Sequence, residues 1–326
     1  MKRDYYTKID AGRVFLWALV VAQLLGAVFA FILIKAGGGT VEGYNELLKN
    51  DLIITIQAML AQAAFLIVYL YFNRGVDYKK ASKINVRLGW QNVLICVAIA
   101  IICIFGFSFL TQISDEFLTY IGYKLEESIL PLDNAGWLVL NIILLAAVPA
   151  VLEELVFRGV ILNAFRKKTG DMAGIFISAA LFSLIHCSPQ QTIFTFVFGI
   201  VLAFVVVKTG SVVSSMIIHF LNNAIAVIFM YAKFDIVLSI PTWAVALIAV
   251  GATAVTFVSV YFLGKLLKNT DKSISLEESI IEVEEDNAGS EKAVESNLSL
   301  VIGIALCATM WIMVLVDKLG LMGGTV

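Results

Sequence analysis

The sequence predicts an all-α, polytopic bundle of transmembrane helices with about nine spans, because of its composition, its long apolar segments and the placement of its charges. Of its 326 residues, 60% are hydrophobic and 15% are charged, and the mean hydropathy is +0.93. A soluble domain carries about 25% charged residues to cover its surface. The charges here cluster in short segments between long apolar ones, which is typical of a chain that crosses a bilayer repeatedly.

Nine segments are long enough to cross a hydrocarbon core of roughly 30 Å, for which a helix needs about 20 apolar residues. They are 14–34, 52–72, 90–110, 137–165, 172–188, 191–207, 211–232, 241–264 and 298–316. The connections between 172 and 232 are very short, so the expected count is eight to nine spans, and a hairpin or re-entrant segment there is the alternative. The first segment is longer than the apolar part of a signal peptide and lacks a small-residue cleavage site, so we expect it to be retained.

These segments divide the chain into five parts. We expect N-terminal transmembrane helices 1–3 in 1–136, a catalytic core of spans four to seven in 137–232 and an eighth helix in 233–268. An acidic, flexible linker in 269–297 and a C-terminal helix in 298–326 complete the chain. The linker's acidic cluster is typical of a solvated segment, and a regulatory or partner-binding role is the alternative.

The basic residues predict the orientation, because Lys and Arg in short loops stay mostly on the cytoplasmic side. They cluster before the first segment and after the second, fourth, sixth and eighth, all on one side of the predicted bundle. The sequence therefore predicts a multi-pass protein of a plasma membrane with a cytoplasmic N-terminus and an outside C-terminus. A net charge of −2 gives no support for nucleic-acid binding. The four cysteines lie in or at the end of apolar segments without metal-site spacing, and we interpret them as packing residues. The sequence does not indicate an oligomeric state.

Three ionisable residues lie inside the fourth segment, where each costs roughly 2.5–3.5 kcal/mol or more to insert. Glu154 and Arg158 are spaced i, i+4 and are expected to pair on one face of the helix. Glu153 points elsewhere, about 140° from Arg158, so it is the carboxylate predicted to face a cavity as a general base. Pro149 is expected to kink this helix and make room for water, although prolines are also common in membrane helices without any catalytic role.

Both histidines of the chain lie in apolar segments, His186 in the fifth and His219 in the seventh. A single buried histidine is most often a hydrogen-bonded structural residue, but two of them together with a buried acidic pair favour a functional site. Asn223 follows His219 by one helical turn and can address the same point, whereas Asn222 is the weaker candidate. At about 1.5 Å of rise per residue, Glu154, His186 and His219 all fall near the middle of the membrane.

The three motifs resemble those of the CPBP family, the CAAX proteases and bacteriocin-processing enzymes also called Abi proteins. The motifs are Glu-Glu-x-x-x-Arg, Phe-x-x-x-His and His-x-x-x-Asn on successive membrane segments. Their residues in this chain are Glu153, Glu154 and Arg158; Phe182 and His186; and His219 and Asn223. The resemblance covers residues 153–223, and the rest of the chain matches only as apolar helices.

The resemblance implies an intramembrane endopeptidase in which Glu153 and His186 activate water while His219 and Asn223 stabilise the oxyanion. Glu154, Arg158 and Phe182 would support the site. A metal-free reaction is favoured because the compact HExxH spacing is absent; a zinc ion held by Glu153, His186 and His219 is the alternative.

The expected partners are the lipid bilayer and a peptide or membrane-anchored protein substrate, with a role in bacteriocin or peptide maturation or in self-immunity. Prenylated CAAX proteins, bacteriocin leaders, pheromone precursors and anti-sigma factors all stay open as substrates. A transporter or proton relay and a non-catalytic membrane regulator are the alternatives from other classes. A transporter is expected to show an internal repeat and broken helices, neither of which the sequence indicates.

Overall fold

The computed structural model describes residues 2–125, 134–234, 237, 240–271 and 290–321, with backbone alone for 290–297. The described residues form helices and no named strand, which confirms the all-α prediction. In chain order the helices are α1 (Lys8–Ala36), α2 (Val41–Leu47), α3 (Asp51–Phe72), α4 (Tyr78–Ala81), α5 (Trp90–Tyr120), α6 (Ala135–Asn141), η1 (Ile142–Ala147), α7 (Val148–Glu154), η2 (Leu155–Leu162), α8 (Asn163–Ile185), α9 (Pro189–Thr209), α10 (Val212–Tyr231), α11 (Thr242–Leu266) and α13 (Ser290–Lys318). Elements η1 and η2 are π-helical.

Eight helices within the described residues are long and apolar enough to cross a membrane. The longest, Ala135–Ile185, contains both the fourth and the fifth predicted segments. It reverses direction at Gly170, which has a left-handed φ of 80° and ψ of 166°. Ser178 Oγ donates to Phe157 O at 2.9 Å across the hairpin. The two segments are therefore antiparallel neighbours, and each of the nine predicted segments coincides with helix.

The helices differ from the predicted segments mainly in length. Helix α1 begins at Lys8 instead of 14, because Thr7 and Asp10 form a capping box. Helix α5 continues ten residues beyond its predicted end to Tyr120, so Asp115 and Glu116, which follow the predicted segment 90–110, are helical. Helix α13 begins at Ser290, inside the predicted linker 269–297. Residues 272–289 of that linker, including its acidic cluster, lie outside the described residues.

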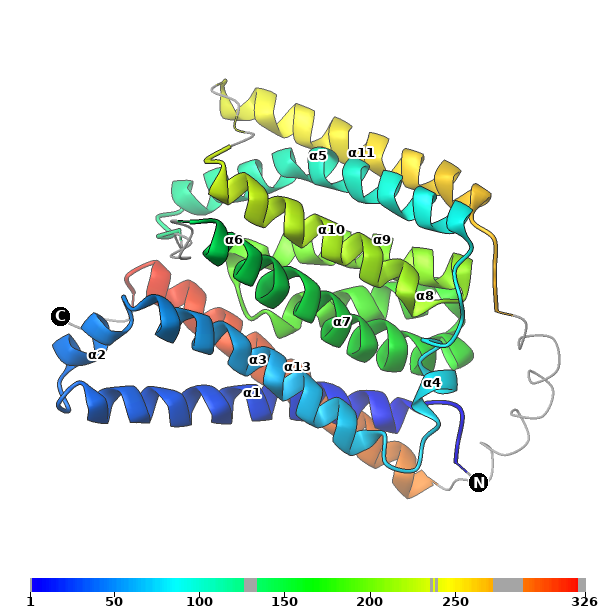
Figure 1. The fold of residues 1–326 in the computed structure, drawn as a ribbon, viewed down its shortest axis with the longest axis horizontal. Coiled ribbons are helices and arrows are strands. Elements are labelled where there is room, and N and C mark those ends of the chain that lie inside the picture. The colour runs from blue at the N-terminus through cyan, green and yellow to red at the C-terminus, as the bar shows by residue number, and fades with distance from the viewer. Residues whose placement is uncertain (1, 126–133, 235–236, 238–239, 272–289, 322–326) are drawn as a thin grey trace.

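The bundle has three layers, as Figure 1 shows. Helices α1, α3 and α13 form one side and α5 and α11 form the other. The segment from α6 to α10 lies between them, and it carries all the residues of the three motifs. Large apolar side chains such as Trp17, Leu70, Trp243 and Val250 are exposed on the outer helices. This surface suits a lipid environment, where apolar side chains face outward.

The basic loops gather at one end of the bundle. Arg3 N donates to Gly75 O at 3.1 Å, and the Lys167 ammonium lies 4.6 Å from the centroid of the Tyr5 ring. Thr270 N donates to Thr209 O at 3.0 Å, next to Lys208. We call this end, made of residues 2–13, 74–87, 166–168, 208–211 and 265–271, the basic end. The opposite end holds the other connections, where Lys124 N donates to Lys318 O at 3.0 Å.

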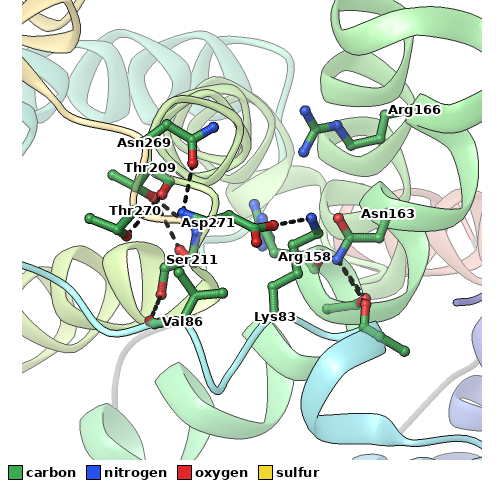
Figure 2. Close-up of polar contacts among 12 residues, drawn as sticks. Lys83, Val86, Arg158, Asn163, Arg166, Thr209, Ser211, Asn269, Thr270 and Asp271 are labelled. Carbon is green, nitrogen blue, oxygen red and sulfur yellow. Dashed lines mark hydrogen bonds and ion pairs between the residues drawn. The ribbon is translucent and has the colours of Figure 1, made fainter. Parts of the chain in front are cut away.

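Polar contacts tie three loops together at the basic end (Figure 2). Lys83 forms an ion pair with Asp271, and Ser211 Oγ donates to Val86 O at 2.7 Å. Gly210 has a φ of 71°, and a Cβ there would come within 2.7 Å of the side chains of Asn269 and Asp271. A glycine at this turn therefore lets residues 209–211 pack against the segment after α11. We call these contacts, made by Lys83, Val86, Thr209, Ser211, Thr270 and Asp271, the clasp.

The close contact of α8 and α9 depends on Gly199. A Cβ at this position would lie 3.1 Å from Ala179 Cα and 3.3 Å from Phe182 Cδ1. Gly199 O also accepts a hydrogen bond from Arg158 Nη2 at 3.1 Å. The missing side chain thus brings the backbone of α9 against both the ring of Phe182 and a buried guanidinium.

Candidate active site

A cavity of about 1340 Å³ lies within the bundle and is lined by residues of α3, α5, α7, α9 and α10 together with the end of α8. Four residues singled out from the sequence line it: Glu153, His186, His219 and Asn223. They come from three different helices or helix ends. These four polar residues, which the sequence places on separate membrane segments, therefore line the same cavity.

Glu153 lies on α7, is 8% exposed and faces the cavity. Its carboxylate has a side-chain partner on another helix. Gln62 Nε2, from the middle of α3, donates to Glu153 Oε1 at 2.8 Å. This contact fixes one carboxylate oxygen and leaves Oε2 directed toward His219, whose Nε2 is 4.0 Å away.

Glu154 and Arg158 form the expected pair, and both side chains are fully buried. Arg158 Nη1 donates to Glu154 Oε1 at 2.9 Å, and the same oxygen lies 2.9 Å from His219 Nδ1. Because a carboxylate can only accept, this geometry requires the proton on Nδ1 of His219. Glu154 thus links a cation on its own helix to an imidazole on α10.

The helix around this pair is widened. Pro149 follows the π-helical turns of η1. The hydrogen-bond pattern of these turns accommodates a residue without a backbone N–H. A second π-helical stretch, η2, begins directly after Glu154 and contains Arg158. Asn163 Nδ2 donates to Arg158 O at 3.1 Å and to Gly159 O at 2.9 Å, which satisfies carbonyls that the irregular helix leaves open. The sequence predicts a proline kink, and the structure places π-helical turns on both sides of α7.

His186 ends α8, where the chain turns sharply into α9. Cys187 has a left-handed φ of 49°, and Pro189 opens α9. The Pro ring favours extended backbone at Ser188, which has φ −121° and ψ 119°. His186 Nδ1 lies 2.7 Å from Phe182 O. A carbonyl only accepts, so Nδ1 carries the proton and the other ring nitrogen, Nε2, has a free lone pair.

The ring of Phe182 packs against the charged and aromatic groups of the site. The Arg158 guanidinium lies 4.4 Å from its centroid, close enough for a cation–π interaction. The rings of His186 and His219 make edge contacts with it at centroid distances of 5.0 and 5.9 Å. Phe182 thereby sets the orientation of both imidazoles and covers one face of the guanidinium.

Asn222 and Asn223 both line the cavity from α10. Asn223 Nδ2 donates to Leu145 O at 3.2 Å, and Asn223 Oδ1 accepts from Asn222 Nδ2 at 3.2 Å. The carbonyl of Leu145 belongs to η1, where π-helical geometry exposes backbone oxygen atoms. Asn223 is thus oriented from both sides, and Asn222, the weaker candidate by sequence, contributes to that orientation.

The grouping of potential metal ligands bears on the zinc alternative. No three His, Cys, Asp or Glu side chains among the described residues are close enough together to hold a metal ion. Glu153, His186 and His219 share the cavity; Nδ1 of each ring and Oε1 of Glu153 are engaged, which leaves Nε2 of each ring and Oε2 of Glu153 without these contacts.

Gln62 is the functional candidate that the sequence argument misses. Its side chain is 7% exposed, lines the cavity and contacts Glu153. Its Oε1 is buried without a partner among the described residues. A signal is present in the sequence, because a glutamine in the middle of an apolar span needs a polar partner, but no spacing rule connects α3 to Glu153.

Replacing Arg158 with Ala should destabilise the protein by about 3–5 kcal/mol, because Glu154 would stay buried without its guanidinium partner. The apparent melting temperature in detergent and the yield of folded protein measure this loss. Arg87→Ala, which removes an exposed arginine at the basic end, is the matched control and should have no effect. The double variant Glu154→Gln, Arg158→Met should recover most of the stability; equal losses in the single and double variants would contradict the argument.

Residues 135–225 match the family model described as Type II CAAX prenyl endopeptidase Rce1-like. The matched region begins at α6, ends within α10 and includes all the motif residues. No curated protein matches the chain. The match supports an intramembrane endopeptidase in general and a multi-pass membrane protein. Over residues 135–225 the chain is thus similar to the Rce1-like CAAX endopeptidases, consistent with the CPBP and CAAX protease family that its three motifs resemble.

Proposed function

We propose that this protein hydrolyses a peptide bond in a membrane-associated peptide or protein precursor, with a water molecule activated by Glu153. The observation that carries the proposal is the convergence of Glu153, His186 and His219 on one cavity inside the bundle. The cavity volume of about 1340 Å³ exceeds the roughly 300–1,000 Å³ of small-molecule sites. It therefore suits an extended peptide better than a small ligand.

Glu153 and His186 together can hold and activate water. The lone pair on His186 Nε2 accepts one hydrogen of the water, and Glu153 Oε2 takes the other as a proton. The water oxygen then forms a bond to the carbonyl carbon of the scissile peptide. Gln62 keeps Oε1 of the carboxylate in place, so Oε2 is the oxygen available for proton transfer.

His219 and Asn223 can stabilise the negative oxygen of the tetrahedral intermediate. His219 Nδ1 donates to Glu154, so Nε2 donates to an oxyanion when the ring is the imidazolium, whose charge the Glu154 carboxylate stabilises. Asn223 has a second amide hydrogen beside the one that it gives to Leu145. The intermediate collapses as the C–N bond breaks, and the proton held by Glu153 passes to the leaving amine.

The biological setting that we propose is a plasma membrane, with the basic end on the cytoplasmic side. Short loops rich in Lys and Arg stay on that side during insertion. The C-terminus then lies outside, because α13 ends near the connection after α5. Maturation of a bacteriocin or another peptide, or self-immunity against one, are roles that fit a protease in this position.

Replacing Glu153 with Gln should lower the rate of peptide cleavage at least about 100-fold while the protein still folds. Gln is isosteric and its carbonyl oxygen can still accept the hydrogen bond from Gln62. Cleavage of a quenched fluorescent peptide by purified protein measures the loss, and the melting temperature reports folding. Glu42→Gln, at an exposed position on α2, is the matched control. Undiminished cleavage by Glu153→Gln would rule out this carboxylate as the base.

Gln62→Leu should reduce kcat about 10-fold with little change in KM, because a hydrogen bond to a charged group contributes roughly 1.5 kcal/mol or more. Gln57→Leu makes the same change at an exposed position of α3 and should leave both constants unchanged. In the Glu153→Gln background, Gln62→Leu should have no further effect on the rate, because both substitutions act on one carboxylate. Independent, multiplying effects would show that Gln62 acts elsewhere.

Activity should not depend on zinc. Purified protein should contain far less than one zinc per chain by elemental analysis, and 1,10-phenanthroline should leave peptide cleavage unchanged. Stoichiometric zinc, together with activity lost to the chelator and restored by added zinc, would instead assign Glu153, His186 and His219 as ligands.

A further inference from the structure

We infer that α13 holds in place the turn that carries His186, and that Trp311 of α13 is a positioning residue for this imidazole. The inference rests on the proposed function and deepens it, because it extends the site to a helix outside residues 135–225, the region that matches the family model. Three contacts of α13, the backbone of the turn between α8 and α9, and the role of His186 in holding water support it.

One face of α13 packs against the rest of the protein. Gly303, Cys307 and Trp311 are spaced four residues apart, so they lie within about 80° of one another around the helix axis. On the opposite face, apolar side chains such as Ile312 are exposed. Helix α13 lies beside α1 (Figure 1), and a Cβ at Gly303 would come within 2.8 Å of Phe15 Cδ1. The small residue therefore lets the two helices approach closely.

The other two residues of this face contact the connection between α8 and α9. A side-chain hydrogen bond joins the thiols of Cys307 and Cys187, and both residues are buried. One turn further along α13, Trp311 Nε1 donates to Thr192 Oγ1 at 2.7 Å. We call residues 183–192 the α8–α9 turn. Helix α13 thus contacts this turn both in its middle and at its end.

The α8–α9 turn has a backbone that depends on its surroundings. Cys187 has a left-handed φ of 49°, which residues with a side chain rarely adopt, so neighbouring contacts must stabilise it. Ser183 Oγ donates to Thr192 O at 2.8 Å, and Thr192 Oγ1 donates to Ser188 O at 2.7 Å. These two bonds close the turn on itself. Because Thr192 Oγ1 also accepts from Trp311, α13 is bound to the residue that closes the turn.

His186 lies between the bonds that close the turn and directly before Cys187. Its Nδ1 is 2.7 Å from Phe182 O, and its Nε2 is the atom that holds water in the proposed reaction. A shift of the turn therefore moves Nε2 relative to Glu153, and a displacement of about 1 Å can slow a reaction about 100-fold. None of the described residues of α13 lines the cavity. The contacts of α13 should thus affect the chemical step and not the binding of the peptide.

The first test measures kcat and KM of the purified full-length chain with a quenched fluorescent decapeptide, selected from a library for cleavage by the wild type. Trp311→Phe keeps an aromatic ring but removes the indole N–H. It should lower kcat about 5-fold with little change in KM, the loss expected for one neutral hydrogen bond. Trp243→Phe makes the same change at an exposed position of α11 and should leave both constants unchanged.

Changes at Thr192 examine the same bond from its other side. Thr192→Val should lower kcat at least as much as Trp311→Phe, because it also removes the bond to Ser188 O. Thr192→Ser keeps the hydroxyl and should retain the wild-type kcat. In the Thr192→Val background, Trp311→Phe should have no further effect, since both substitutions remove one bond.

The second test follows His186 without requiring catalysis. The chain has two histidines, so protein with isotope-labelled histidine gives ring signals in nuclear magnetic resonance from His186 and His219 alone, and His186→Gln assigns them. The His186 signals should shift in both Trp311→Phe and Thr192→Val, although Thr192→Val alters no aromatic ring. The His219 signals should stay in place, because Glu154 holds that ring from another helix.

The outcomes separate the inference from the proposed function. An unchanged kcat in both Trp311→Phe and Thr192→Val would overturn the inference. A lower melting temperature with wild-type kcat and His186 signals would also overturn it, because α13 would then serve only to stabilise the bundle. Absence of cleavage by the wild type, with the His186 signals shifted in both variants, would reject the proposed function and support the positioning of His186 by α13.

Discussion

The structure is organised around one buried contact, in which Glu154 Oε1 receives both Arg158 Nη1 and His219 Nδ1 at 2.9 Å. Charged side chains inside a membrane usually pair with one another or face a water-filled cavity, and this carboxylate connects η2 to α10. The same contact requires a hydrogen on Nδ1 of His219, and Nε2 of the ring lies 4.0 Å from Glu153 Oε2. One interaction thus serves both the packing of the core and the electrostatics of the cavity.

The helix that carries this contact is irregular on both sides of α7. The π-helical turns of η1 and η2 widen the segment that carries Glu153 and Glu154, and Asn163 satisfies the carbonyls of Arg158 and Gly159. Gly199 lets α9 approach closely enough for its carbonyl to accept from Arg158. π-Helical turns often occur at functional sites because they reorient side chains without ending the helix. Glu153, on α7 between the two π-helical stretches, faces the cavity while its neighbour Glu154 stays in the core.

The two ends of the bundle differ in where they lie relative to the cavity. The basic end is held by the clasp and lies behind the buried pair and an apolar cluster of Leu162, Ile175, Ala203 and Val206, whereas the cavity lining reaches the connections of the opposite end. A hydrolase in a membrane needs a path for water and substrate that does not breach the bilayer. Polar groups such as Gln62 and Glu153 line the cavity, while large apolar side chains are exposed on the outer helices.

The sequence by itself determined the helical class, the positions of the membrane segments and the pairing of Glu154 with Arg158, because apolar length and i, i+4 spacing are local properties. It also singled out the imidazoles and the amide that line the cavity, since polar side chains in apolar helices are rare enough to stand out. Only the tertiary structure decided that Gln62 contacts Glu153, that α5 extends to Tyr120 along the cavity, and that π-helical turns replace a simple proline kink. These features depend on contacts between helices far apart in the chain, and no periodicity within a single segment records which neighbour a side chain will meet.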